Sequence, residues 1–175
     1  MNRVFSISII FLLIGCASGI PKDTNLEWQY NHSTDVAHFN VLRTLPMEIE
    51  AEKCNFIVWE LEAIQTFKGN LLPGDKIQVW GPNDPEYWQV GGERLMFLRM
   101  YEGNGYNSCS THLFRSYKQV HWSCCEITEK DGAAEVQFET MLNSEQRGPD
   151  IPVDANKVFE ALRSYEAESP NKRVN

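Results

Sequence analysis

The chain has little positive charge for its size. Of its 175 residues, 16 are lysine or arginine and 24 are aspartate or glutamate, and no stretch gathers the basic residues into a patch. Nucleic acids and anionic lipid surfaces attract basic patches, so this balance argues against either as a charge-driven partner. The hydrophobic fraction of 42% instead predicts a packed globular body, because disordered chains contain far fewer apolar residues.

Signatures of the common catalytic classes are also missing. The sequence contains no Gly-x-Ser-x-Gly, no His-Glu-x-x-His, no phosphate-binding glycine loop followed by Lys-Ser/Thr, and no redox-type Cys-x-x-Cys. The paired carboxylates of Glu60 and Glu62 fall on one face of an expected strand, which is typical of a solvated surface. The sequence therefore predicts a protein that is not an enzyme and that holds no cofactor and no metal.

Long apolar runs are scarce, and the one that stands out is at the N-terminus. An apolar-dominated stretch of about 11 residues begins just after Arg3 and ends in Leu-Ile-Gly-Cys, whose last residue is Cys16; this is the pattern of a secretory signal peptide. The run is too short to span a bilayer, and no later run reaches that length. We therefore expect a signal peptide over residues 1–15.

The Leu-Ile-Gly-Cys sequence resembles the lipobox of bacterial lipoproteins. The resemblance implies diacylation of the Cys16 thiol, cleavage before Cys16 and acylation of the new amino group. Each buried methylene would contribute about 0.8 kcal/mol, so two or three acyl chains would anchor a soluble domain in a membrane. Ala17, by analogy with sorting in enterobacteria, implies the outer membrane, facing the periplasm. The alternative is ordinary cleavage after residues 17–19, which would release a free secreted protein.

The part that follows residue 15 is long enough for one domain. Arg3 is the only charged residue among the first 15, so the remaining 160 residues carry 15 basic and 24 acidic side chains, a net charge of −9. We expect a lipidated tether over 16–34, a β domain over 35–147, and a linker, a C-terminal helix and a tail over 148–175.

Four cysteines remain for the fold, and an exported protein meets an oxidising compartment that favours their pairing. Cys124 and Cys125 are adjacent and are unsuited to bonding each other, because the ring would be strained. We therefore expect Cys54 and Cys109 to be tied separately to Cys124 and Cys125, with either pairing open. Each bridge would stabilise the fold by about 2–4 kcal/mol.

Metal binding is the other use of these thiols that the sequence suggests. His112 and His121 precede Cys124 and Cys125 in the sequence, and histidine and cysteine are ligand types for zinc or copper. Their spacing fits no closed-site pattern, so disulfides with surface histidines are the preferred interpretation.

The mature chain predicts mainly β-strands. Apolar residues alternate over 57–64 and 76–80, and turn signals follow at 68–70, 73–75 and 131–132. A near-continuous apolar run over 93–101 predicts a strand buried on both faces. Asp154 is placed to cap a helix whose apolar residues recur at helical spacing from Val158 to Tyr165. Several short strands and one helix favour a small β-barrel or sandwich.

Three segments also carry a family resemblance. They are Ala-Ile-Gln-Thr-Phe-Lys-Gly at 63–69, Pro-Gly-Asp-Lys-Ile-Gln-Val-Trp-Gly-Pro at 73–82, and Gly-Gly-Glu-Arg-Leu-Met-Phe-Leu at 91–98. Their order is similar to the netrin-like modules related to tissue inhibitors of metalloproteinases, over roughly residues 50–125. The resemblance implies an oligonucleotide/oligosaccharide-binding-type (OB-type) β-barrel with a C-terminal α-helix.

Inhibition of metalloproteinases, which that family performs, is not expected here. Family members chelate the catalytic zinc with the free amine of an N-terminal cysteine that begins a Cys-x-Cys sequence. Here Cys16 is expected to carry lipid and an acylated amine, and an amide nitrogen has no lone pair available for zinc. Ala17-Ser18 also replaces the Cys-x-Cys start.

An aromatic loop is the remaining candidate site. Trp80, Tyr87 and Trp88, with carboxylates nearby, could form a stacking surface for a glycan or an extended peptide; alternatively, the two tryptophans cover the end of the barrel. The sequence as a whole predicts a membrane-anchored, non-catalytic binding module in the cell envelope, with an envelope protein or a glycan as its partner. The alternative is a protease inhibitor or a small envelope enzyme with an unrecognised site.

Overall fold

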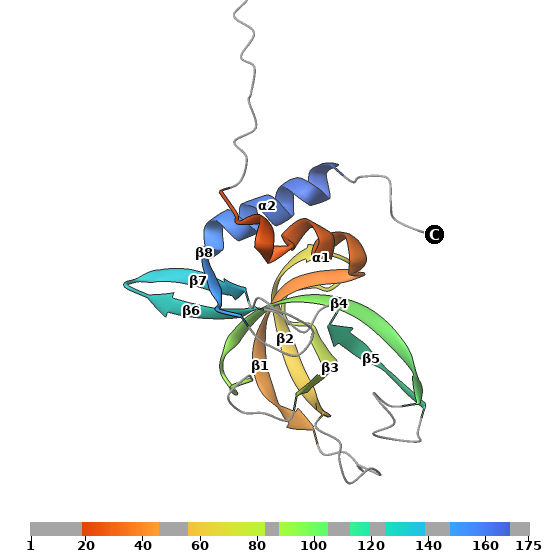
Figure 1. Cartoon of the computed structure of the whole chain (residues 1–175). Coiled ribbons are helices and arrows are strands. Elements are labelled where there is room, and N and C mark those ends of the chain that lie inside the picture. The colour runs from red at the N-terminus through yellow and green to blue at the C-terminus, as the bar shows by residue number, and fades with distance from the viewer. Residues whose placement is uncertain are drawn as a thin grey trace, which may run out of the picture.

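The computed structural model describes residues 19–45, 56–82, 88–104, 113–119, 125–138 and 148–168. This part of the chain is mainly β, with a helix at its C-terminal end (Figure 1). In chain order the elements are η1 (Lys22–Thr24), α1 (Leu26–His32), β1 (Asp35–Leu45), β2 (Phe56–Lys68), β3 (Lys76–Pro82), β4 (Glu93–Asn104), β5 (Leu113–Gln119), β6 (Glu126–Lys130), β7 (Ala133–Phe138), β8 (Ile151–Asp154) and α2 (Ala155–Glu168).

The strands form one sheet with the order β1-β2-β3-β5-β4-β6-β7-β8, and β1 also pairs with β4. Among the described strands the β3–β5 pairing is parallel, whereas the other pairings are antiparallel. The first half of β1 therefore has a neighbour on each side, with β2 along one edge and β4 along the other.

Strand β4 is the centre of the arrangement because it also has neighbours on both edges. Arg94 lies opposite Phe39 of β1 and opposite Glu126 of β6. Leu98 in the same way lies opposite Asp35 of β1 and Gln119 of β5. Strands β5 and β6 therefore follow one another along the edge of β4 that faces away from β1.

Two hydrophobic cores lie on opposite faces of the central strands. Leu95 and Phe97 belong to a helix-side core, whereas Met96 and Leu98 belong to an inner core. Successive side chains of a strand point to opposite faces, so the apolar run of β4 is buried on both, as the sequence predicted. The helix-side core comprises Leu26, Tyr30, Val36, Phe67, Leu95, Phe97, Cys125, Val136, Phe138, Val153, Ala155, Val158, Ala161 and Leu162. The inner core comprises Ala37, Phe39, Val41, Trp59, Leu61, Ala63, Ile77, Val79, Trp88, Met96 and Leu98.

Local sequence signals account for several element ends. Asp131 and Gly132 have φ angles of 52° and 78°, the left-handed backbone that a two-residue hairpin turn requires. They join β6 to β7. Helix α2 begins where the Asp154 carboxylate accepts a hydrogen bond from the Asn156 N–H at 2.8 Å, so the predicted cap is confirmed. Val158 and Leu162 of α2 are fully buried, which confirms its predicted apolar face.

The prediction of a tether over residues 16–34 is wrong for its second half. Ile20 packs against the helix-side core, and helix α1 buries Leu26 and Tyr30 there. The polar composition of this segment gave no helix signal, because only one side of a seven-residue helix needs apolar side chains.

The expected linker at 148–152 also requires correction. Residues Ile151–Asp154 form β8, which pairs with β7, and Pro152 lies opposite Gln137. Proline cannot donate to the ladder and usually marks a loop or an edge, so the sequence favoured a linker here. Strand β7 consequently has a neighbour on each side, β6 and β8.

Candidate functional site

The tryptophans of the predicted aromatic site are buried. Trp80 is 3% exposed and Trp88 is 2% exposed. The Trp88 ring lies 5.4 Å from that of Trp59 in the inner core, and a Cβ added at Gly81 would come within 3.0 Å of both rings. Tyr87 lies outside the described residues. The two described indoles therefore have no open face for a ligand, and Trp88 serves as core packing.

Arg94 lies at the same end of the inner core. Its side chain is 4% exposed, and its guanidinium carbon lies 5.4 Å from the centre of the Trp88 ring. A cation over an indole face is attracted by the ring quadrupole, and this attraction strengthens away from water. The Trp88–Arg94 contact therefore stabilises the start of β4, the segment singled out in the sequence by Gly-Gly-Glu-Arg.

One predicted disulfide cysteine lies within the described residues. Cys125 is fully buried in the helix-side core and is disulfide-bonded. Its carbonyl accepts a hydrogen bond from the Leu95 N–H at 2.9 Å, which places it beside β4. The predicted lipidation site Cys16 lies outside the described residues, as do Cys54, Cys109 and Cys124.

The structure also brings together a polar pair that the sequence did not single out. His38 of β1 and Glu93 of β4 lie on the helix side of the sheet, with Nε2 and Oε2 2.8 Å apart. The His38 ring is 5.6 Å from the ring of Phe159 on α2. Glu93 is half exposed, whereas only 11% of the His38 side chain is accessible. Fifty-five residues separate the two, so only the β1–β4 pairing makes them neighbours.

An imidazole hydrogen-bonded to a carboxylate can hold or pass a proton, but catalysis also needs a group for it to act on. In the described ranges no cluster of three or more His, Cys, Asp or Glu residues is arranged to hold a metal ion. The buried Asn40 Oδ1 on the same strand face has no hydrogen-bond partner. The His38–Glu93 pair is best explained as a bridge between strands beneath α2.

The outer face of α1 carries an exposed aromatic pair. Trp28 is 47% exposed, and its ring stacks on that of His32 with 4.3 Å between centroids. Helix α1 is held to the sheet by the Lys68 ammonium, which donates to the Tyr30 carbonyl at 2.6 Å. Leu26, Gln29 and Tyr30 point inward, so Trp28 points to the opposite side.

No known protein-family model matches the chain, and no curated protein matches it significantly. None of the helices in the described ranges is long and apolar enough to cross a membrane.

Proposed function

We propose that this chain is an exported lipoprotein, anchored in a membrane of the cell envelope through Cys16. The observation that carries the proposal is the Leu-Ile-Gly-Cys sequence at the end of a short apolar run. The disulfide-bonded state of Cys125 supports it, because such bonds form in oxidising compartments and are rare in the cytosol. We further propose that Cys125 is bonded to Cys54 or Cys109, and Cys124 to the other.

We propose that strands β1–β5 form an OB-type barrel of the netrin-like kind. The order of strand pairing supports this, because it leads from β1 back to β1: β1–β2, β2–β3, β3–β5, β5–β4 and β4–β1. The inner core, which draws on β1, β2, β3 and β4, is where the interior of such a barrel would lie.

The anchored domain is proposed to be a non-catalytic binding module, with an envelope protein or a glycan as its partner. The missing catalytic signatures favour this function. The His38–Glu93 pair also favours it, because a bridge between strands β1 and β4 explains this pair without a catalytic role.

Replacing the acylated residue tests the anchor. Cys16→Ser should move the protein from the membrane fraction to the soluble fraction, and the acylated N-terminal peptide should disappear from mass spectra. Ser18→Ala, which keeps the Leu-Ile-Gly-Cys sequence, should remain in the membrane with its acyl chains. A Cys16→Ser protein still found in the membrane would contradict the proposal. Crosslinking in intact cells, followed by identification of the captured molecule, would test the binding role.

A further inference from the structure

We propose that the helical layer of the domain, formed by η1, α1 and α2, lies directly on the lipid bilayer in which Cys16 is anchored, with Trp28 at the lipid–water interface. This inference rests on the proposed lipidation of Cys16. It adds which face of the domain meets the membrane and which end points away.

The chain between Cys16 and the folded domain is short. Ile20 already packs against the helix-side core, so only four residue steps separate it from Cys16. At full extension four residues span about 14 Å. The polar headgroup region of one leaflet takes up about 5–8 Å of that distance. The space that remains is smaller than the diameter of a helix, about 10 Å, so no other protein would fit between the domain and the lipid.

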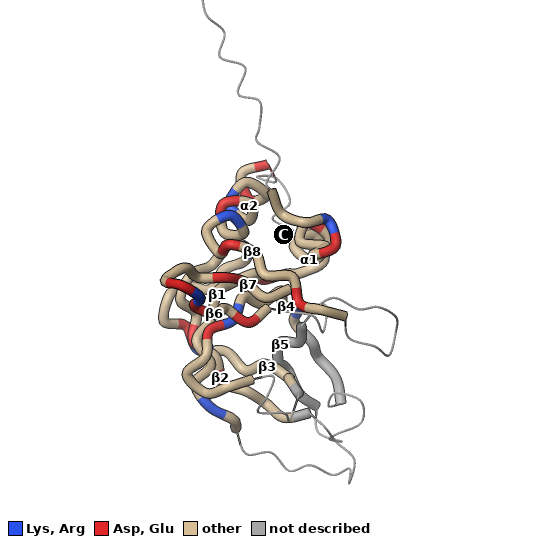
Figure 2. The backbone as a smooth tube through the Cα atoms, turned by 60° about the vertical axis from the view of Figure 1, so that its left-hand side comes forward, with Lys and Arg blue, Asp and Glu red and all other residues tan. Residues whose placement is uncertain are grey.

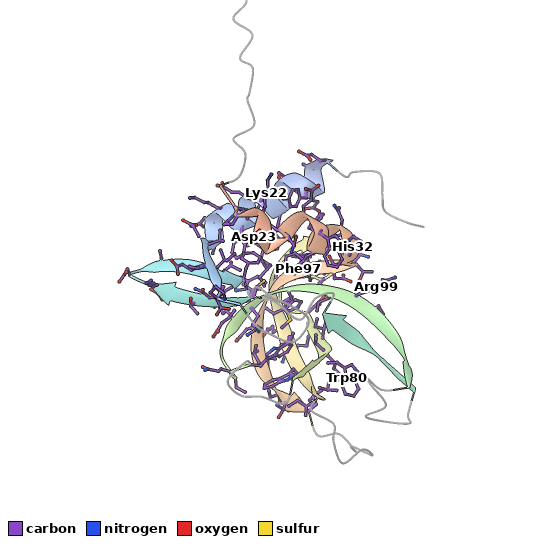
Figure 3. The ribbon with its side chains drawn as sticks, in the orientation of Figure 1. Lys22, Asp23, His32, Trp80, Phe97 and Arg99 are labelled. Carbon is purple, nitrogen blue, oxygen red and sulfur yellow. The ribbon has the colours of Figure 1, made fainter. Side chains whose placement is uncertain are left out.

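The chain enters the fold at the helical layer. Ile20 leads directly into η1 and α1, which are tied together by the bond from Gln29 Nε2 to the Thr24 carbonyl at 3.0 Å. Helix α1 in turn packs beside α2, with the rings of Tyr30 and Tyr165 5.4 Å apart. Figure 3 shows Lys22 and Asp23 at this helical end of the molecule and Trp80 at the opposite end. An anchor at Cys16 therefore holds the helical layer toward the bilayer.

The helical layer also exposes a large aromatic side chain. Trp28 is one of four exposed large hydrophobic residues among those described, and it lies on the outer face of α1. An indole has an apolar body and a polar N–H, and tryptophan is enriched where hydrocarbon meets headgroups. The stacked His32 ring widens the same aromatic surface.

Charge does not provide the attraction. Both signs are interspersed on the helical layer (Figure 2), with the basic residues Lys22, Lys157 and Arg163 among more numerous acidic ones. A layer without an excess of positive charge gains little from anionic lipid. The short connection to the anchor and the interfacial Trp28 would therefore hold this face to the membrane, and the contact should be insensitive to salt.

Photo-crosslinking from two positions tests the orientation. The photoreactive residue p-benzoyl-L-phenylalanine is introduced as Trp28→p-benzoyl-L-phenylalanine or as Val90→p-benzoyl-L-phenylalanine in the full chain. Each processed protein is then placed in vesicles of zwitterionic phosphatidylethanolamine and phosphatidylcholine. Val90 is a matched control because it is also exposed, at 64%. Val90 also lies away from the helical layer. Its neighbour Gly91 donates its N–H to the Val41 carbonyl. Val41 lies six residues, or about 20 Å, along β1 from Asp35, where β1 begins shortly after the end of α1.

We expect phospholipid adducts on the peptide containing position 28 and none above background on the peptide containing position 90. Equal labelling at both positions, or labelling at 90 alone, would overturn the inference. The mass of the N-terminal peptide is measured in the same sample. A protein without acyl chains contradicts the proposed anchor, whereas an acylated protein without adducts at 28 contradicts only the orientation.

A longer connection provides a second test. Inserting 15 Gly/Ser residues after Ala17 adds a mean reach of about 20 Å. If the short connection holds the layer on the bilayer, the insertion should leave acylation and membrane fractionation intact but reduce the adducts at position 28. Unchanged adducts would show that the layer binds lipid without help from the short connection, which would overturn this part of the argument.

Discussion

At the scale of single residues, burial separates packing residues from candidate binding residues. The sequence marked Trp80 and Trp88 as a candidate stacking surface, yet both are almost fully covered. Trp28, in a segment expected to be a polar tether, is the tryptophan of the described residues that is substantially exposed. A tryptophan in a sequence signals a large apolar surface, but its neighbours in space decide whether that surface meets the core or a partner.

Replacing Trp88 therefore tests the core rather than a binding site. Trp88→Ala should lower the free energy of unfolding by about 3–5 kcal/mol, because it removes an indole packed on Trp59 and leaves a cavity. Val90→Ala, two residues away and 64% exposed, should change it by less than about 0.5 kcal/mol. Urea unfolding followed by circular dichroism measures both. Equal stability of the two variants would contradict the packing role.

The Arg43–Glu60 ion pair should make the stability of the fold depend on pH. The hydrogen bond from Arg43 Nε to Glu60 Oε2, 2.9 Å long, together with the charge of the guanidinium, lowers the pKa of the Glu60 carboxyl below its ordinary value. A lowered folded-state pKa means that this pair stabilises the fold above the ordinary glutamate pKa, and that the contribution is lost as the pH falls through the folded-state pKa.

An NMR titration of the Glu60 carboxyl carbon measures this pKa. In Arg43→Gln it should rise toward the ordinary value, whereas Arg99→Gln, which removes an exposed charge on β4, should leave it unchanged. An unshifted pKa in the parent protein would rule out the stabilising hydrogen bond.

At the scale of elements, the sequence predicted those with strong periodicity or a capping residue but missed the short ones. Helix α2 has a carboxylate cap and an apolar stripe within its own sequence, so local signals suffice to predict it. Helix α1 and strand β8 span seven and four residues. Elements of that length are marginal alone, and these two are stabilised by partners distant in sequence, the helix-side core and strand β7.

The cap of α2 can be tested with a matched pair of variants. Asp154→Ala removes the acceptor for the Asn156 N–H and should cost about 1 kcal/mol of stability. Asp154→Asn keeps an oxygen in the same place and should unfold close to the parent. Thermal unfolding distinguishes the two. The cap would have no energetic role if alanine and asparagine behaved alike.

At the scale of the whole molecule, the central strands lie between two cores. The helix-side core joins residues from both ends of the chain, since Leu26 and Leu162 belong to it. Cys125 is fully buried in this core and is disulfide-bonded there. Loss of that bond should therefore affect the stability of the whole fold.

Cys125→Ser should lower the free energy of unfolding by about 2–4 kcal/mol, because the unfolded chain loses a constraint. Treating the parent with a reductant should give a drop of similar size, and reducing the variant should have a smaller further effect. Guanidinium unfolding with and without dithiothreitol makes the comparison. A parent protein whose unfolding midpoint is the same in both conditions would contradict a stabilising disulfide.

Features that depend on neighbours along the chain could be predicted from the amino-acid sequence alone. The alternation that places Trp59, Leu61 and Ala63 in one core, the double burial of β4, the Asp131-Gly132 turn and the cap of α2 follow from local periods and backbone preferences. The contacts between segments distant in sequence became known from the folded molecule alone. It placed β1 beside both β2 and β4, joined His38 to Glu93, covered Trp88 and left Trp28 exposed. Strand pairing and burial depend on which surfaces meet in space. The local pattern of apolar and polar residues does not identify the distant segment with which a strand or helix will pack.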